Sequence, residues 1–157
     1  MANKTLALYE RMRRWPAGHW LFTRAICFKA PYFGSISPLI EVLEPGRCVA
    51  RLRRHRAITN HIGSVHAIAM CNLAELVGGM MTEVSLPDSM RWIPKGMTVE
   101  YVKKGMGTIR GVATPAIPIV AADIGYPLPV DVVLTDDAGD VVFRATISMW
   151  MSPRPAR

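Results

Sequence analysis

One carboxylate stands out between Ser64 and Met81, a stretch rich in Ala, Leu and Met. After Ser64, the strongly polar side chains in this stretch are His66, Asn72 and Glu75. An ionised carboxylate is costly to bury alone, so Glu75 must be paired, protonated or exposed to a cavity where its chemistry is used. Beside a cavity, a carboxylate can act as a general base or as a nucleophile. Glu75 is therefore the first candidate for a catalytic residue.

The same stretch predicts a long helix over residues 64–81. Ala, Leu and Met favour helices, and Ser64 is suited to cap the free N–H groups of the first turn. Apolar residues surround the predicted axis instead of following one stripe, so we expect the helix to be buried inside other elements. Its polar residues and its glycines argue against a span across a bilayer.

The sequence on either side of this helix predicts what is packed around it. Residues 1–34 are expected to form a helical extension, with helices near 6–13 and 17–28 separated by Pro16. Residues 39–53 predict a hairpin around the turn at 44–47, and strands follow at 90–104, 108–114, 130–134 and 141–151. No assignment is made for residues 116–129, and a frayed tail is expected at 153–157. This order predicts an α+β fold in which an antiparallel sheet curls around the helix.

Composition limits the possible functions. The chain has 157 residues, 50% of them hydrophobic, which fits a single domain over 1–157 with a substantial core. Its net charge of +7 suggests a polyanionic partner: nucleic acid, an acidic membrane surface, or a phosphate-bearing molecule such as coenzyme A. Nucleic acid is disfavoured because the basic residues lack interleaved aromatics. Three irregularly spaced cysteines and the absence of a signal-like start predict a soluble cytoplasmic protein with reduced thiols.

One motif resembles a known family. The run Asn60-x-x-Gly63-x-x-His66, followed nine residues after His66 by a Leu-Ala-Glu that ends at Glu75, resembles the active-site signature of hotdog-fold acyl-CoA thioesterases of the phenylacetate-pathway type. In those enzymes the pattern is an Asn, then His-Gly-Gly, then Leu-Ala-Asp on the central helix. Over most of its length, the chain is also similar to a branch of that superfamily catalogued as a domain of unknown function. The resemblance implies a hotdog fold, in which a curved antiparallel sheet wraps around a long central helix.

The resemblance also implies roles. Glu75 would be the nucleophile or the general base on a water, and Asn60 would orient that water or the substrate. The backbone N–H of Ala67 would polarise the thioester carbonyl, because free N–H groups and the helix dipole converge at a helix start. His66 would support that turn. Two positions depart from the family: Ala67-Ile68 replaces Gly-Gly, and a Glu replaces the Asp.

Further residues are expected to contact the substrate, an acyl thioester of coenzyme A or of an acyl carrier. Loop residues near the helix start would lie beside it: His61, Gly63 and Ser64. Basic residues would meet the phosphates of coenzyme A: Arg51, Arg53, Lys103, Lys104 and Arg110. The alternative for the basic run is a solvated outer face. The resemblance further implies a homodimer with two sites at its interface, or a tetramer, and no metal or cofactor beyond the coenzyme A of the substrate.

Other interpretations stay open. His61 and Glu75 are 14 positions apart, a spacing similar to that of hotdog-fold hydroxyacyl dehydratases, although the proline-rich loop typical of those enzymes is missing. A non-catalytic acyl-CoA or lipid-binding protein is a second alternative. Each residue also has a structural explanation: Glu75 could pair with an arginine of the sheet, His66 could be a hydrogen-bonded structural residue, and Asn60 could be a turn residue.

Overall fold

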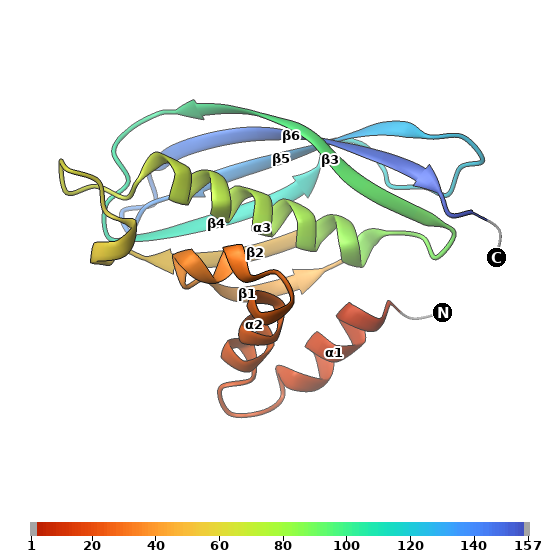
Figure 1. Ribbon diagram of the computed structural model, residues 1–157, viewed down its shortest axis with the longest axis horizontal. Helices are drawn as coiled ribbons and strands as arrows, with labels where there is room; N and C mark the ends of the chain where they lie inside the picture. The colour runs from red at the N-terminus through yellow and green to blue at the C-terminus, as the bar shows by residue number, and fades with distance from the viewer. Residues whose placement is uncertain (1–2, 156–157) are drawn as a thin grey trace.

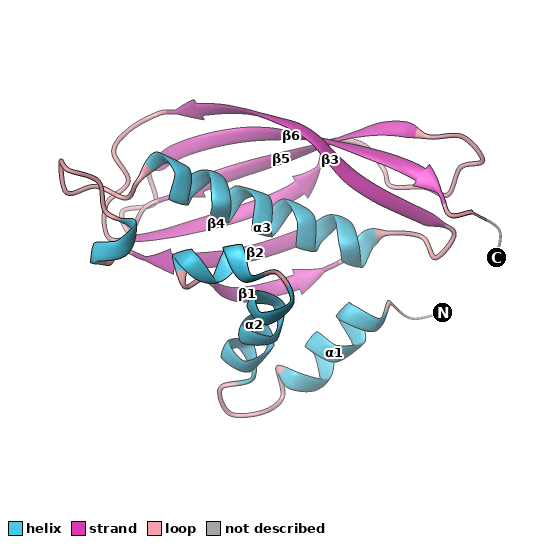
Figure 2. Cartoon of the chain, viewed as in Figure 1, coloured by secondary structure: helices cyan, strands magenta, loops and turns pink. Residues whose placement is uncertain are grey.

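The computed structural model describes residues 3–155. Its strands form one antiparallel sheet in the order β1-β2-β4-β5-β6-β3. The strands are β1 Leu39–Glu44, β2 Arg47–Arg53, β3 Met90–Tyr101, β4 Thr108–Pro115, β5 Tyr126–Thr135 and β6 Val141–Pro153. The α-helices are α1 Lys4–Met12, α2 Gly18–Lys29 and α3 Ala67–Ser85, and short 3-10 helices lie at Pro31–Ile36 (η1) and Arg56–Ile58 (η2). The sheet curves around α3, while α1 and α2 lie beyond β1 (Figures 1 and 2).

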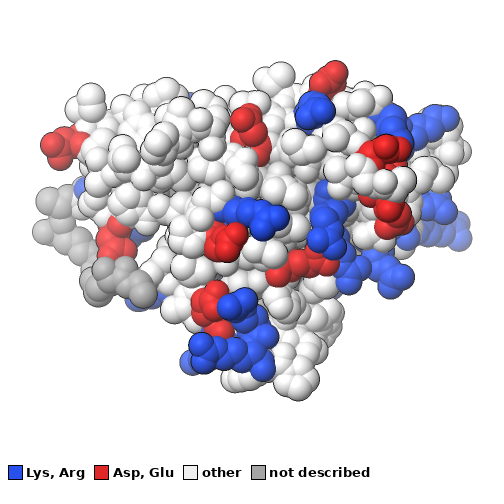
Figure 3. All heavy atoms as spheres, turned by 180° about the vertical axis from the view of Figure 1, so that it is seen from behind, with Lys and Arg blue, Asp and Glu red and all other residues white. Residues whose placement is uncertain are grey.

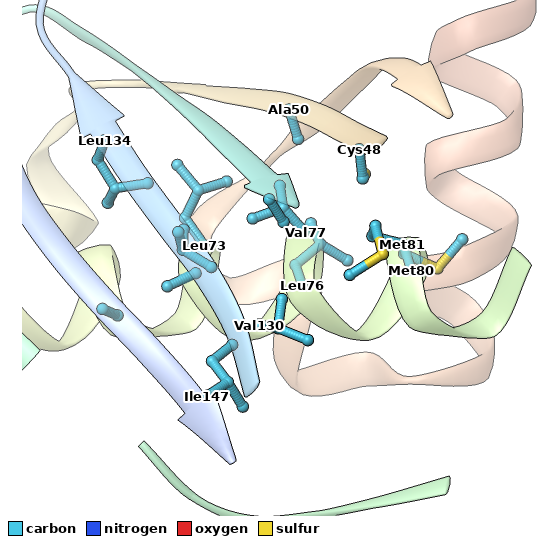
Figure 4. Close-up of a cluster of buried hydrophobic side chains, with 14 of the residues drawn as sticks. Cys48, Ala50, Leu73, Leu76, Val77, Met80, Met81, Val130, Leu134 and Ile147 are labelled. Carbon is cyan, nitrogen blue, oxygen red and sulfur yellow. The ribbon is translucent and has the colours of Figure 1, made fainter. Parts of the chain in front are cut away.

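The apolar face of α3 forms the centre of the core. Leu73, Val77 and Met81 are fully buried and, as Figure 4 shows, lie among side chains of the sheet. Gly78 brings the helix close to β6, because a Cβ at this position would lie only 2.6 Å from Cδ1 of Ile147. The prediction of a long helix wrapped by strands is therefore confirmed.

The start of this helix differs from the prediction. α3 begins at Ala67, not at Ser64, and its N-cap is His66, whose Nδ1 accepts the N–H of Ile68 at 3.1 Å. The side chain of Asn60 is the reason: its Oδ1 accepts the N–H of Ser64 at 3.1 Å and its Nδ2 donates to the Ser64 hydroxyl at 2.8 Å. These bonds fold residues 60–65 into a tight loop. The helix therefore begins after this loop, and Ser64 takes part in the loop and does not cap the helix.

The predicted strands are all present, and β5 begins earlier than expected, inside the segment for which no assignment was made. Its first residues include Pro127 and Pro129, which lack the N–H of a central strand. They fit here because β5 pairs with β6 from Tyr126 onward but with β4 only from Val130. On the β4 side of these prolines the backbone bond is the one that Ala116 donates to the carbonyl oxygen of Pro129 at 2.9 Å, and this bond needs no N–H from proline.

The N-terminal helices are packed on the same core as the sheet. Tyr9 of α1 is 2% exposed, its ring lies edge-on to that of Phe22 of α2, and its hydroxyl donates to the carbonyl oxygen of Glu41 at 2.9 Å. α2 in turn packs against β1, the edge strand. The two predicted N-terminal helices are thus confirmed, and they cover an open edge of the sheet.

Two further expectations concern the central helix and the tail. Among the residues that the structure describes, α3 alone has the length and hydropathy to cross a membrane, but 67% of that window is buried inside the fold, as in a core helix. The tail that was expected to fray from residue 153 is held as far as Arg154, which donates its N–H to Ser89 and its Nε to Met90. Residues 156–157 lie outside the described part of the chain.

Candidate functional site

A cavity of about 320 Å³ lies beside the second half of α3. Three groups of elements enclose it: α3 itself, the N-terminal helices with η1, and strands β3 and β6. Its apolar walls are formed by Ile26, Phe33, Leu76, Met80, Trp92 and Met149. Flexible methionines and flat aromatic rings suit an apolar guest of variable shape.

Charged groups stand on the wall of this cavity. Glu75 lines it, is exposed, and has no hydrogen bond or ion pair among the described residues. Glu83 also lines it, but its Oε2 accepts the indole N–H of Trp92 at 2.9 Å. Lys29 contributes one exposed ammonium group. Of these two carboxylates, Glu75 is therefore the one free to accept a proton or to attack a substrate.

The expectation that α3 is buried all round is wrong along one stripe. Ile68, Cys71, Glu75 and Gly79, spaced three or four residues apart, are exposed or half-buried on one face. β3 runs along this stripe in the opposite direction, so that Cys71 Sγ lies 3.2 Å from the Tyr101 hydroxyl. This hydrogen bond, aided by burial, raises the pKa of Tyr101 to about 12. Glu75 is thus presented on the surface of the helix, and it is not paired with an arginine of the sheet.

A second hollow, of about 160 Å³, lies at the N-terminus of α3 between η1 and η2. Asn72, which is 4% exposed, lines it; its Nδ2 donates to the Ser35 hydroxyl at 3.2 Å, but its buried Oδ1 has no partner. His66 lines the same hollow. The first N–H groups of a helix have no acceptor within the helix. The His66 ring accepts the N–H of Ile68, but it does not accept the N–H of Ala67.

The structure separates the predicted catalytic residues into two groups. His66 and Ala67 stand at the helix start, whereas Glu75 lies eight residues beyond Ala67, about 12 Å further along the axis at a rise of about 1.5 Å per residue. The cavity beside Glu75 borders the second half of α3, since it reaches Glu83. Two hollows therefore lie along one face of α3, one at the helix start and one beside Glu75.

The loop residues before α3 lie further from the cavity. Both polar ends of the Asn60 side chain are engaged within its own loop, as in a structural turn. His61 is exposed and is not among the residues that line the cavity beside Glu75. Gly63 adopts a φ of +80°, a conformation that glycine favours, and its carbonyl oxygen accepts a hydrogen bond from Arg54.

The predicted phosphate-binding residues differ in whether an acidic side chain already pairs with them. Arg51 and Arg110 both pair with Glu41, at 2.8 and 3.1 Å, and Lys103 pairs with Asp136 and Asp140. Arg53 and Lys104 are exposed and have no ion pair among the described residues. Basic side chains, with acidic ones among them, gather at the end of the molecule opposite the chain termini (Figure 3).

Several residues around the cavity were not found from the sequence. Glu83 lies eight residues after Glu75, two turns along the same helix face, and this periodicity could have revealed it. Ile26, Phe33 and Trp92 could not be found in this way, because they come from distant segments that meet only in the folded chain.

Comparison with known structures defines the class of this fold. A crystal structure of a genomics target is 40% identical to this chain, covers 96% of it and 98% of the target, and has a TM-score of 0.81. A Pseudomonas aeruginosa protein of unknown function, described as a probable thioesterase, is 26% identical over 79% of this chain and 88% of its own, with a TM-score of 0.69. A thioesterase from Haemophilus influenzae has a TM-score of 0.68 at 10% identity, over 78% of this chain and 82% of its own. The protein has a thioesterase-like hotdog fold.

The family follows from the sequence match. Residues 18–151, from the start of α2 to a point two residues before the end of β6, match the family described as a domain of unknown function, DUF4442. The chain therefore belongs to this family. No curated protein matches the sequence.

Proposed function

We propose that this protein hydrolyses an acyl thioester, with Glu75 as the general base or the nucleophile and the acyl group in the apolar cavity. The observation that carries the proposal is the Glu75 carboxylate, which lies on the wall of that cavity without a partner among residues 3–155. The thioesterase-like hotdog fold supports it.

The chemistry needs a base, a water and a place for negative charge. As a general base, Glu75 takes a proton from water while the water oxygen attacks the thioester carbon. The tetrahedral intermediate then collapses, the C–S bond breaks, and the leaving thiolate takes the proton that Glu75 holds, so that a carboxylic acid and a thiol remain. The Ala67 N–H, reinforced by the dipole of α3, would stabilise the oxyanion of the tetrahedral intermediate.

One chain cannot supply both groups to the same carbonyl, because about 12 Å of helix separates Glu75 from Ala67. We therefore propose a homodimer in which Glu75 of one copy meets the Ala67 N–H of the other. β3 is an edge strand of twelve residues with 58% of Ile93 exposed, and an edge of this length is normally covered. A two-fold axis beside β3 would pair the strands and produce two equivalent sites.

Thiol release from a panel of acyl-CoAs tests the hydrolysis. We expect Glu75→Gln to lower kcat/KM by about 100-fold or more, because a positioned base contributes about 10²–10⁴ to the rate. Glu44→Gln is the matched control, since Glu44 is an exposed carboxylate at the β1–β2 turn, away from the cavity. If the wild-type protein binds acyl-CoA but releases no thiol, the protein is a non-catalytic acyl-CoA-binding protein. Hydration of an enoyl thioester that is lost in His61→Ala would indicate a dehydratase.

A further inference from the structure

A groove of about 300 Å³ lies between α2 and the β1–β2 hairpin. Its lining shares no residue with the cavity or with the hollow at the start of α3. Side chains that could bind an anion or a flat ring dominate it: Trp20, Arg24, Arg51, Arg53 and His55.

The groove is positively charged. Of the residues that the structure describes, three arginines line it and no acidic residue does. Arg51 is neutralised in part by Glu41 at 2.8 Å, but Arg24 and Arg53 have no ion pair among the described residues. His55 also lines the groove, and its buried Nε2 has no hydrogen-bond partner among the described residues, a state that costs free energy. Guanidinium groups bind the oxygens of anions such as phosphates and carboxylates strongly, often through two parallel hydrogen bonds.

The groove also offers an aromatic face. Trp20 is 54% exposed, and the Arg24 guanidinium lies 5.8 Å from the centroid of its ring. Aromatic rings and guanidinium planes are the surfaces on which nucleobases stack. A bare phosphate would need no such ring, and a nucleic acid strand would need several in succession. One aromatic ring beside unpaired arginines fits a single nucleotide that carries more than one phosphate.

The position of the groove connects it with the proposed reaction. Ser35 and Ile36 line the hollow at the start of α3, whereas the next residues, Ser37 and Pro38, line the groove. His55 likewise lines the groove, and η2, which begins at the next residue, lines the hollow. The same two segments, residues 35–38 and 55–58, therefore border both spaces, so a flexible arm could join a nucleotide in the groove to a thioester at the Ala67 N–H.

We propose that this groove binds the nucleotide end of coenzyme A, so that the substrate is carried by coenzyme A and not by an acyl carrier protein. This inference rests on the proposed hydrolysis only for the identity of the substrate. The nucleotide site itself can be tested without any reaction.

Calorimetric titration of the full chain with adenosine 3′,5′-bisphosphate tests the site, with inorganic pyrophosphate as the second probe. Arg53→Glu should weaken the affinity for both probes at least about tenfold, because it reverses a charge in the groove. Trp20→Ala should weaken only the nucleotide, by about tenfold, through the lost stacking. Arg11→Glu, the same charge change on the exposed side of α1, should leave both affinities unchanged. Thermal unfolding of each variant verifies that it is folded.

Two results would overturn the site: no measurable binding of the nucleotide, or equal binding by wild type and Arg53→Glu. Equal affinity for pyrophosphate and nucleotide, unchanged in Trp20→Ala, would also overturn it, since the groove would then be an unspecific anion site.

Kinetics separate this proposal from the hydrolysis itself. Arg53→Glu should lower the preference for acyl-CoA over the matching N-acetylcysteamine thioester about tenfold, mainly through KM. Hydrolysis of both substrates with equal efficiency, together with no nucleotide binding, contradicts the groove but leaves the hydrolysis standing. Nucleotide binding without hydrolysis of either substrate supports the groove and contradicts the hydrolysis.

Discussion

The hydrogen bond between Cys71 and Tyr101 changes a measurable property of one residue, the pKa of Tyr101. It is the main cause that raises the pKa of Tyr101 from 10.0 to about 12. In the unfolded chain this phenol loses its proton near pH 10, whereas in the folded chain it keeps the proton to about pH 12. The unfolded state therefore binds fewer protons in this window, and the contribution of Tyr101 to stability is lost as the pH rises from about 10 to 12.

We predict that Cys71→Ala lowers the pKa of Tyr101 toward its ordinary value. Absorbance of the phenolate near 295 nm, titrated in wild type and variant, measures the shift, and the difference between the two curves isolates Tyr101 from the other tyrosines. Thermal unfolding should also lose less stability between about pH 10 and 12 in the variant than in wild type. Identical titration curves would contradict the prediction.

Glu75 and its cavity show how far single residues could be predicted. The sequence shows that Glu75 stands alone within an apolar stretch. Exposure to a cavity was one of the three possibilities predicted for it, and Glu75 does line a cavity. Its exposure could not be predicted, because the stripe that stays uncovered depends on where β3 and η1 lie. The roles given to Asn60, His66 and Ala67 remain predictions, and the engaged side chain of Asn60 favours the structural explanation for that residue.

At the scale of elements, the packing of α3 on the sheet depends on Gly78. A methyl group there would lie 2.6 Å from Cδ1 of Ile147, which is 2% exposed and has little room to move. We predict that Gly78→Ala lowers the free energy of unfolding by about 1–2 kcal/mol, since overpacking outweighs the gain of up to about 1 kcal/mol in helix propensity.

Chemical denaturation of Gly78→Ala and of a control, Gly96→Ala, tests this packing argument. Gly96 lies in β3 with no atom within 4 Å of an added Cβ, so its replacement should change stability by less than about 0.5 kcal/mol. A Gly78 variant as stable as wild type would show that the helix can move away from β6.

The elements were predicted more completely than their ends. Hydrophobic periodicity and turn residues identified α1, α2, the central helix and the strands, because these signals are local. The start of α3 was misplaced because the Asn60 side chain competes for Ser64, which is a matter of three-dimensional contact. The start of β5 was missed because Pro127 and Pro129 suggest a loop until it is known that the ladder with β4 begins only at Val130.

At the scale of the whole molecule, the proposed site requires two copies of the chain. We predict a dimer at micromolar concentration, measured by sedimentation or by light scattering after gel filtration. Ile93→Lys should shift it toward monomer, because a charge would then stand on the exposed edge strand. A wild-type monomer that hydrolyses thioesters would contradict the shared site.

Mixing two inactive variants tests the shared site more directly. Ala67→Pro removes only the N–H of the first helical residue, where proline is favoured, and the extended His66 before it accommodates the ring. Neither Ala67→Pro nor Glu75→Gln alone should be active. Random exchange of subunits should restore about a quarter of the wild-type rate, since half of the dimers then hold one intact site of two. No recovery after verified exchange would indicate that both groups act within one chain.

The charges on the cavity wall have a consequence for what leaves it. Two carboxylates, Glu75 and Glu83, and one ammonium group, Lys29, line the otherwise mostly apolar cavity. In the proposed reaction, a neutral thioester enters such a space without electrostatic penalty, whereas the carboxylate formed from it carries a negative charge and is repelled. Glu75 would thereby help to expel the product of the reaction that it starts, so free carboxylates should be poor inhibitors.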